Sequence, residues 1–73
     1  MADVKFEIVE ELAKLAETSG GYTLAVNLVS WNDAEPKVDI RRWDPNGNPK
    51  KGIALSKEQA VMMAETILEK ANY

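Results

Sequence analysis

The segment from residue 37 to residue 47 constrains the fold most, because strict alternation there runs into a tight turn. Val38 and Ile40 point to one face of an extended chain. The other face receives the side chains that alternate with them, Lys37, Asp39, Arg41 and Trp43. The tetrapeptide DPNG at 44–47 then places proline where φ must be about −65° and glycine where φ can be positive. This order predicts a strand over residues 37–43 that ends in a turn.

Two strands and a helix are expected around this segment. Residues 22–31 alternate in the same way, with Leu24, Val26 and Leu28 on one face, and predict a second strand. A short strand at 52–55 precedes Ser56, which begins a capping box in which the serine hydroxyl and Gln59 satisfy each other's backbone amides. An amphipathic helix over about residues 57–72 is predicted by helical spacing of these side chains: Ala60, Met63, Ala64, Ile67, Leu68 and Ala71.

Residues 6–17 support two interpretations. Their composition favours a helix, and five apolar side chains recur at helical spacing: Ile8, Val9, Leu12, Leu15 and Ala16. The pattern by itself therefore predicts a helix. The alternative is a long bulged strand with Phe6 and Ile8 pointing inward and a shift of phase near Glu10 and Glu11.

The size of the chain favours self-association. Its 73 residues form at most one domain, so residues 1–73 are expected to be a single domain. A chain of this length buries only about 60% of the surface that it exposes when unfolded. There is no cysteine and no histidine, so disulfides and the common zinc sites are excluded, and we expect no metal and no cofactor. A homodimer is the remaining way to enlarge the core, and its interface is expected on the wide apolar stripe of the helix: Met63, Ile67 and Leu68.

The sequence gives little support for an enzyme or a membrane protein. Glu10 and Glu11 are adjacent, so a strand would direct them to opposite faces, where they could not act as an acid and base pair. We expect no enzymatic activity. No apolar run approaches the length of a membrane span, and the first residues do not resemble a signal peptide. The expected location is therefore the cytoplasm, in association with the nucleoid.

Charges of opposite sign are segregated along the chain. Residues 1–35 carry two basic and seven acidic residues, a net charge of −5. Residues 36–52 carry five basic and two acidic residues, a net charge of +3. Such segregation in a small, acidic protein predicts an anionic partner for the basic segment.

Five short pieces occur in an order that carries a resemblance. They are FEIVEE at 6–11, SGGYTL at 19–24, VSWN at 29–32, PKVDIRRWDPNG at 36–47 and KGIALS at 51–56. Together with the helix they resemble the positive cofactor 4 family of transcriptional coactivators, most nearly its short, bacterial, YdbC-like branch. The resemblance implies an α+β fold, in which a four-stranded antiparallel sheet precedes one C-terminal helix, and a dimer whose exposed sheet faces bind single-stranded DNA. It also implies a strand at residues 6–17.

The candidate nucleic-acid site lies around the basic segment. Single-strand binding needs cations along the phosphates and flat side chains on which bases stack. Lys37, Arg41 and Trp43 share a strand face, and Gly52 would let the backbone approach a phosphate. The resemblance implies nucleic-acid contacts for Arg41, Trp43 and the KKG at 50–52. The full predicted site is Lys37, Arg41, Trp43, Lys50, Lys51, Gly52 and Trp31.

Two classes of function remain open at this point. The first is a homodimer that binds single-stranded DNA without sequence preference in transcription regulation, replication or repair, or a binder of single-stranded RNA. The second is a small dimeric protein-interaction module with an acidic docking surface, whose partner belongs to the transcription or replication machinery. In the second case the basic side chains are a solvated strand face, and Trp43 covers the edge of the core.

Overall fold

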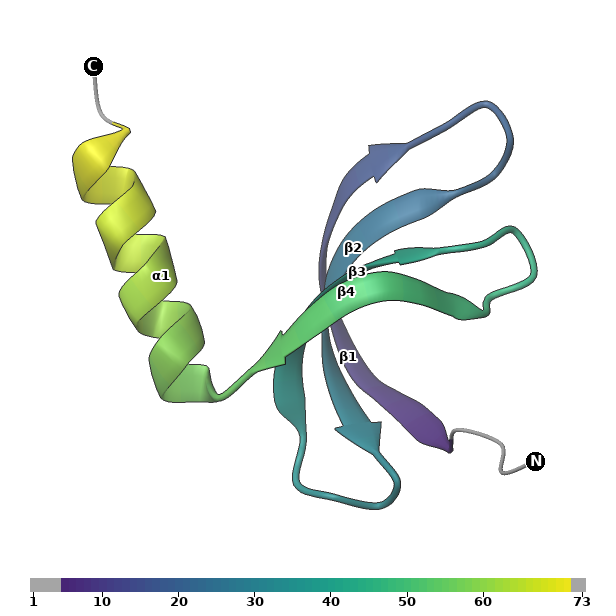
Figure 1. Ribbon diagram of the computed structural model, residues 1–73, viewed down its shortest axis with the longest axis horizontal. Helices are drawn as coiled ribbons and strands as arrows, with labels where there is room; N and C mark the ends of the chain where they lie inside the picture. Colours follow the sequence, from purple (N-terminus) through teal and green to yellow (C-terminus); the bar gives the residue numbers. More distant parts are fainter. Residues whose placement is uncertain (1–4, 72–73) are drawn as a thin grey trace.

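The computed structural model describes residues 5–71, which form four strands and one helix (Figure 1). In chain order these elements are β1 (Phe6–Glu17), β2 (Thr23–Trp31), β3 (Lys37–Trp43), β4 (Pro49–Leu55) and α1 (Lys57–Lys70). The strands form one antiparallel sheet in the order β1-β2-β3-β4. The predicted sequence of four strands and a C-terminal helix is confirmed.

β1 is a strand with three irregularities, which confirms the strand implied by the resemblance, and the helix predicted from the apolar pattern alone is wrong. Its register against β2 shifts between Ile8 and Glu10, between Glu11 and Ala13, and between Lys14 and Ala16. Each shift adds one residue to β1, which therefore uses 12 residues opposite the nine of β2. The extra residues are Val9, Leu12 and Leu15. Bulges at every third residue change the usual period of two into a period of three, which is close to that of a helix.

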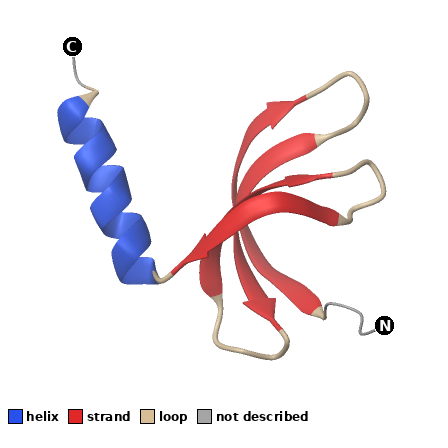
Figure 2. Cartoon of the chain, viewed as in Figure 1, coloured by secondary structure: helices blue, strands red, loops and turns tan. Residues whose placement is uncertain are grey.

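The sheet is strongly curled (Figure 2), and residues of β1, β2 and β3 line a pocket on its inner side, which we call the hollow. Phe6 pairs with Trp31 at one end of the sheet, and Trp43 pairs with Thr23 at the other end. The stretch of β2 between these pairs would span about 26 Å if it were straight. The ring centroids of Phe6 and Trp43 are nevertheless only 5.4 Å apart. Side chains from opposite ends of the strands thus meet across the hollow, because bulges bend and twist a sheet.

The inner surface of the curl, which we call the concave face, holds the core. It contains the side chains that are less than 9% exposed: Ala25, Asn27, Val29, Asp39 and Trp43. The outer surface, which we call the convex face, is apolar and only half-buried. It includes Leu12, Val26, Leu28, Val38 and Ile40, which line a groove together with one side of α1. The alternation predicted for residues 37–43 is confirmed, but the polar face is the buried one.

α1 begins with the predicted capping box. The hydroxyl of Ser56 accepts a hydrogen bond from the backbone amide of Gln59, and the Gln59 side chain accepts one from the amide of Ser56. The helix ends at Lys70, and residue 72 of the predicted range lies outside the described residues. None of its residues is buried, and it stands away from the sheet, which it contacts only through β3 and β4 (Figure 1). Nowhere in residues 5–71 is a helix both long and apolar enough to cross a membrane.

Candidate nucleic-acid interface

The turn between β3 and β4 is fixed by Asp44. The backbone amide of Gly47 donates to the carbonyl of Asp44 at 3.0 Å, and Gly47 has a φ of 84°, which favours glycine. The carboxylate of Asp44 accepts bonds from the amides of Asn46 and Asn48 at 2.9 and 2.8 Å. These bonds, the one from the Asn48 amide first, lower the pKa of Asp44 below its ordinary value. The predicted turn is confirmed, and it holds the ends of β3 and β4 together.

Arg41 is occupied by contacts within the protein. Its Nε and Nη2 atoms donate to the two carboxylate oxygens of Asp39 at 2.7 and 2.8 Å. Its Nη1 atom donates to the carbonyl of Lys50 at 2.9 Å. The Asp39 side chain is fully buried, while 16% of the Arg41 side chain is exposed. A buried, bidentate pair of this kind is strong and leaves little free charge.

Gly52 is required by Arg41. The two residues lie directly opposite each other on β4 and β3. A Cβ atom at position 52 would overlap the Cβ of Arg41 and would lie 2.6 Å from the carbonyl oxygen of Ile40. The missing side chain therefore makes room for Arg41 on the concave face. This role differs from the close approach to a phosphate that the sequence suggested.

Three aromatic rings meet on the concave face. Phe6 lies between the two tryptophans, with its ring centroid 5.4 Å from that of Trp31 and 5.4 Å from that of Trp43. The guanidinium carbon of Arg41 lies 4.7 Å from the centroid of the Trp31 ring. Tilted rings at these distances, and a cation over a tryptophan face, are favourable arrangements.

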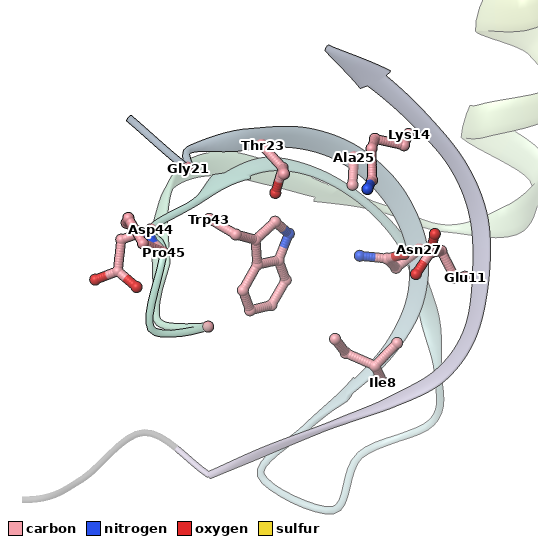
Figure 3. Close-up of a pocket in the computed structure, with 11 residues that line it drawn as sticks. Ile8, Glu11, Lys14, Gly21, Thr23, Ala25, Asn27, Trp43, Asp44 and Pro45 are labelled. Carbon is pink, nitrogen blue, oxygen red and sulfur yellow. The ribbon is translucent and has the colours of Figure 1, made fainter. Parts of the chain in front are cut away.

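Trp43 does not offer an open ring for stacking, and this corrects the sequence-based expectation. Its side chain is only 6% exposed. It stands inside the hollow, where it lines a pocket of about 280 Å³ with residues of β1 and β2 such as Ile8 and Asn27 (Figure 3). Within the described part of the chain, neither the indole N–H of Trp43 nor the Oδ1 atom of Asn27 has a hydrogen-bond partner. The structure thus places Trp43 in the core.

Trp31, in contrast, reaches an open surface. It is half-buried and lines a shallow depression of about 390 Å³ together with Arg41, Pro49 and Ala54. Its indole N–H also lacks a partner among residues 5–71. Trp31 is therefore the tryptophan of the predicted site that a flat ligand can reach.

The predicted lysines do not line one groove with Arg41. Lys37 is exposed at the start of β3, at the end of the sheet opposite to Trp43. The register shift between Arg41 and Trp43 leaves Lys50 and Lys51 together opposite Arg42. The Nζ atom of Lys50 lies 3.7 Å from the Asp44 carboxylate. The lysines are thus exposed at two separate places, Lys37 at one end of β3 and Lys50 and Lys51 opposite Arg42, whereas Arg41, Trp43 and Trp31 lie together on the concave face.

Sequence reasoning missed Asp39 and Phe6. Asp39 precedes Arg41 by two residues on one strand, which puts both side chains on the same face, and this spacing is a signal for an ion pair. For Phe6 no sequence signal was available, because its contact with Trp43 arises from the curl. As to metals, the described range of the chain brings no three His, Cys, Asp or Glu side chains together in a ligand cluster.

The groove on the convex face is the second candidate surface. It has a volume of about 510 Å³, and α1 contributes Ala60, Val61, Met63 and Ala64 to it. The three predicted dimer residues reach solvent, with exposed fractions of 37% for Met63, 53% for Ile67 and 75% for Leu68.

Comparison with known proteins gives a match that covers most of the chain. Residues 20–65 match the family described as Transcriptional Coactivator p15 (PC4). This range includes β2, β3, β4 and the greater part of α1. A search of curated proteins found no match.

Proposed function

The chain belongs to the Transcriptional Coactivator p15 (PC4) family, and on that premise we propose that it is a homodimer that binds single-stranded DNA through the concave face of its sheet. Single-stranded DNA is the ligand of this family's domain. The observation that carries the proposal is the contact between Arg41 and Trp31 beside an open depression. We propose that this binding serves transcription regulation, replication or repair.

The chemistry of this surface suits unpaired bases. A base can stack on a tryptophan or on a guanidinium plane whatever its identity, because every base has a π-face. This surface is formed by strands. Within residues 5–71, no helix lies on this surface that could enter a major groove of duplex DNA. Lys37, Lys50 and Lys51 are exposed around it and can contact phosphates without reading sequence.

The convex face supports the homodimer. The radius of gyration is 13.5 Å, whereas a compact domain of this length has a value of about 11 Å. The difference reflects the helix, which stands away from the sheet and leaves apolar side chains open on both. A second copy that covers this groove would bury Leu12 and Met63, and Ile67 follows Met63 by about one turn of α1. Such burial stabilises by about 25 cal/mol per Å² of apolar surface.

A titration of labelled oligo-dT at several salt concentrations tests the proposal. We expect binding at low salt whose logarithm falls linearly with the logarithm of salt concentration, because phosphate contacts release counterions. A duplex of equal length should bind more weakly. The affinity for single-stranded RNA of equal length, compared with that for oligo-dT, shows whether DNA or RNA is the preferred ligand. Absence of binding at low salt would favour the interaction module with an acidic docking surface.

A further inference from the structure

We propose that Asp39 is a positioning residue that holds the Arg41 guanidinium over the Trp31 ring, so that the two side chains form one stacking surface for an unpaired nucleobase. This inference rests on the proposed function and says which part of the nucleic acid the site takes. The ligand of Arg41 is the base, whereas the sequence alone had suggested a phosphate.

The charge of Arg41 is already satisfied. Both carboxylate oxygens of Asp39 accept bonds from it, and Asp39 has no exposed surface. A phosphate would have to compete with a carboxylate that the fold holds in bidentate geometry. The pair as a whole is neutral, so its attraction for the DNA backbone is weak.

The plane of Arg41, in contrast, is fixed, and part of the side chain is exposed. The bonds to Asp39 and to the carbonyl of Lys50 use all three nitrogen atoms and so determine the orientation of the guanidinium. Gly52 leaves the space in which the side chain lies. The guanidinium carbon is then 4.7 Å from the centre of the Trp31 ring.

The depression beside this stack has the size and lining that a base needs. Its volume of about 390 Å³ falls in the range of small-molecule sites, and Pro49 and Ala54 form its apolar remainder. Proteins that bind single strands stack bases on aromatic rings and on arginine planes. The composite of Trp31 and Arg41 offers both within one surface.

The first test is Arg41→Lys, which keeps the charge and removes the plane. Affinity is measured for oligo-dT and for an abasic oligomer of the same length, over a series of salt concentrations. We expect about 5- to 150-fold weaker binding of oligo-dT, as for the loss of one stacked base, with the salt dependence unchanged. Binding of the abasic oligomer should not change. Equal losses for both oligomers, or no loss for either, would overturn the proposal.

The second test is Asp39→Asn, which keeps the shape of the side chain and removes its charge. If Asp39 orients Arg41 for stacking, this variant should also lose affinity for oligo-dT and keep its affinity for the abasic oligomer. If Arg41 is instead a phosphate ligand that Asp39 restrains, the variant should bind both oligomers more tightly, with a salt slope steeper by about one. A merely structural role of Asp39 predicts equal losses for both oligomers.

Arg42→Lys is the matched control, because it makes the same chemical change one residue further along β3 at an exposed position. It should leave both affinities unchanged. Melting temperatures are recorded beside the affinities. If Asp39→Asn is unfolded at the assay temperature, the affinities of Arg41→Lys for the two oligomers alone test the proposal. A wild-type protein that binds neither oligomer would refute the proposed function itself, which is a different result from binding that is indifferent to Arg41→Lys.

Discussion

The concave face of the sheet carries a carboxylate and an amide and is buried, whereas the convex face carries leucine, valine and isoleucine and is open. Asp39 and Asn27 are 0% and 3% exposed on the concave face. On the convex face, Leu12 is 45% exposed and Ile53 is 55% exposed. Composition alone would have assigned the two faces the other way round, since apolar residues are the ones usually buried.

The difference shows how curvature decides which face needs a partner. A curled sheet brings long side chains together across its hollow, so the concave face covers itself with Arg41, Phe6, Trp31 and Trp43. Burial of Asp39 is tolerated there because the carboxylate is fully paired. The convex face bends away from itself and requires a further layer, which α1 supplies only in part.

The largest expected effect is on the concave face. Asp39→Ala should lower the free energy of unfolding by about 3–5 kcal/mol, because it leaves the Arg41 charge largely buried without a partner. Urea denaturation measures this change. Lys5→Ala is the control, since the Lys5–Asp33 pair is 70% and 75% exposed and should contribute only about 0–1 kcal/mol. Equal costs for the two variants would mean that the concave face is not held by its ion pair.

A charge on the convex side should affect association more than folding. Ile67→Glu should weaken dimerisation by about 1.5–3 kcal/mol, because an apolar side chain no longer enters the interface. Sedimentation equilibrium should then show a shift toward the 8.1 kDa monomer. Met62→Glu is the control, because Met62 is 69% exposed and lies beside Glu58 and Glu65. If Ile67→Glu remains as dimeric as the control, the second copy does not cover this face.

A methyl group at position 52 should disturb the packing of Arg41 on the concave face. Gly52→Ala should cost about 1–3 kcal/mol of stability, since its Cβ would overlap the Arg41 side chain and crowd the β3 backbone. Thermal melts compare it with Gly20→Ala, whose Cβ would meet only ordinary contacts at 3.9 Å. If Gly52→Ala melts like Gly20→Ala, then Arg41 does not require the glycine.

The smallest effect concerns the turn that joins β3 to β4. The lowered pKa of Asp44 means that its charged form stabilises the folded state, fully at a pH above about 3.8 and less as the pH falls through the folded pKa. Asp44→Asn lacks this contribution. The difference in Tm between wild type and variant should therefore be greatest near neutral pH and narrow below pH 3.8. A constant difference across this range would show that the charge of Asp44 is not involved.

Local features of the sequence predicted much of the fold but less of the site. The alternation of residues 37–43, the turn at 44–47 and the capping box at Ser56 were all readable, because each depends on neighbours within a few residues. β1 was not readable from its pattern, because its bulges depend on pairing with β2. In the site, the sequence placed Arg41 and Trp43 on one strand face, but it left open whether Trp43 stacks on bases or packs in the core, and the structure buries it.

The sequence by itself determined which side chains share a strand face, where the chain turns and where the helix begins. These properties follow from the period of two in a strand and from the hydrogen bonds of turns and caps. Only the tertiary structure decided that the polar face is the inner one and that Phe6, Trp31 and Trp43 meet across it. The physical reason is the curl of the sheet, which results from bulges and pairing between strands far apart in the sequence, and which no short segment encodes alone.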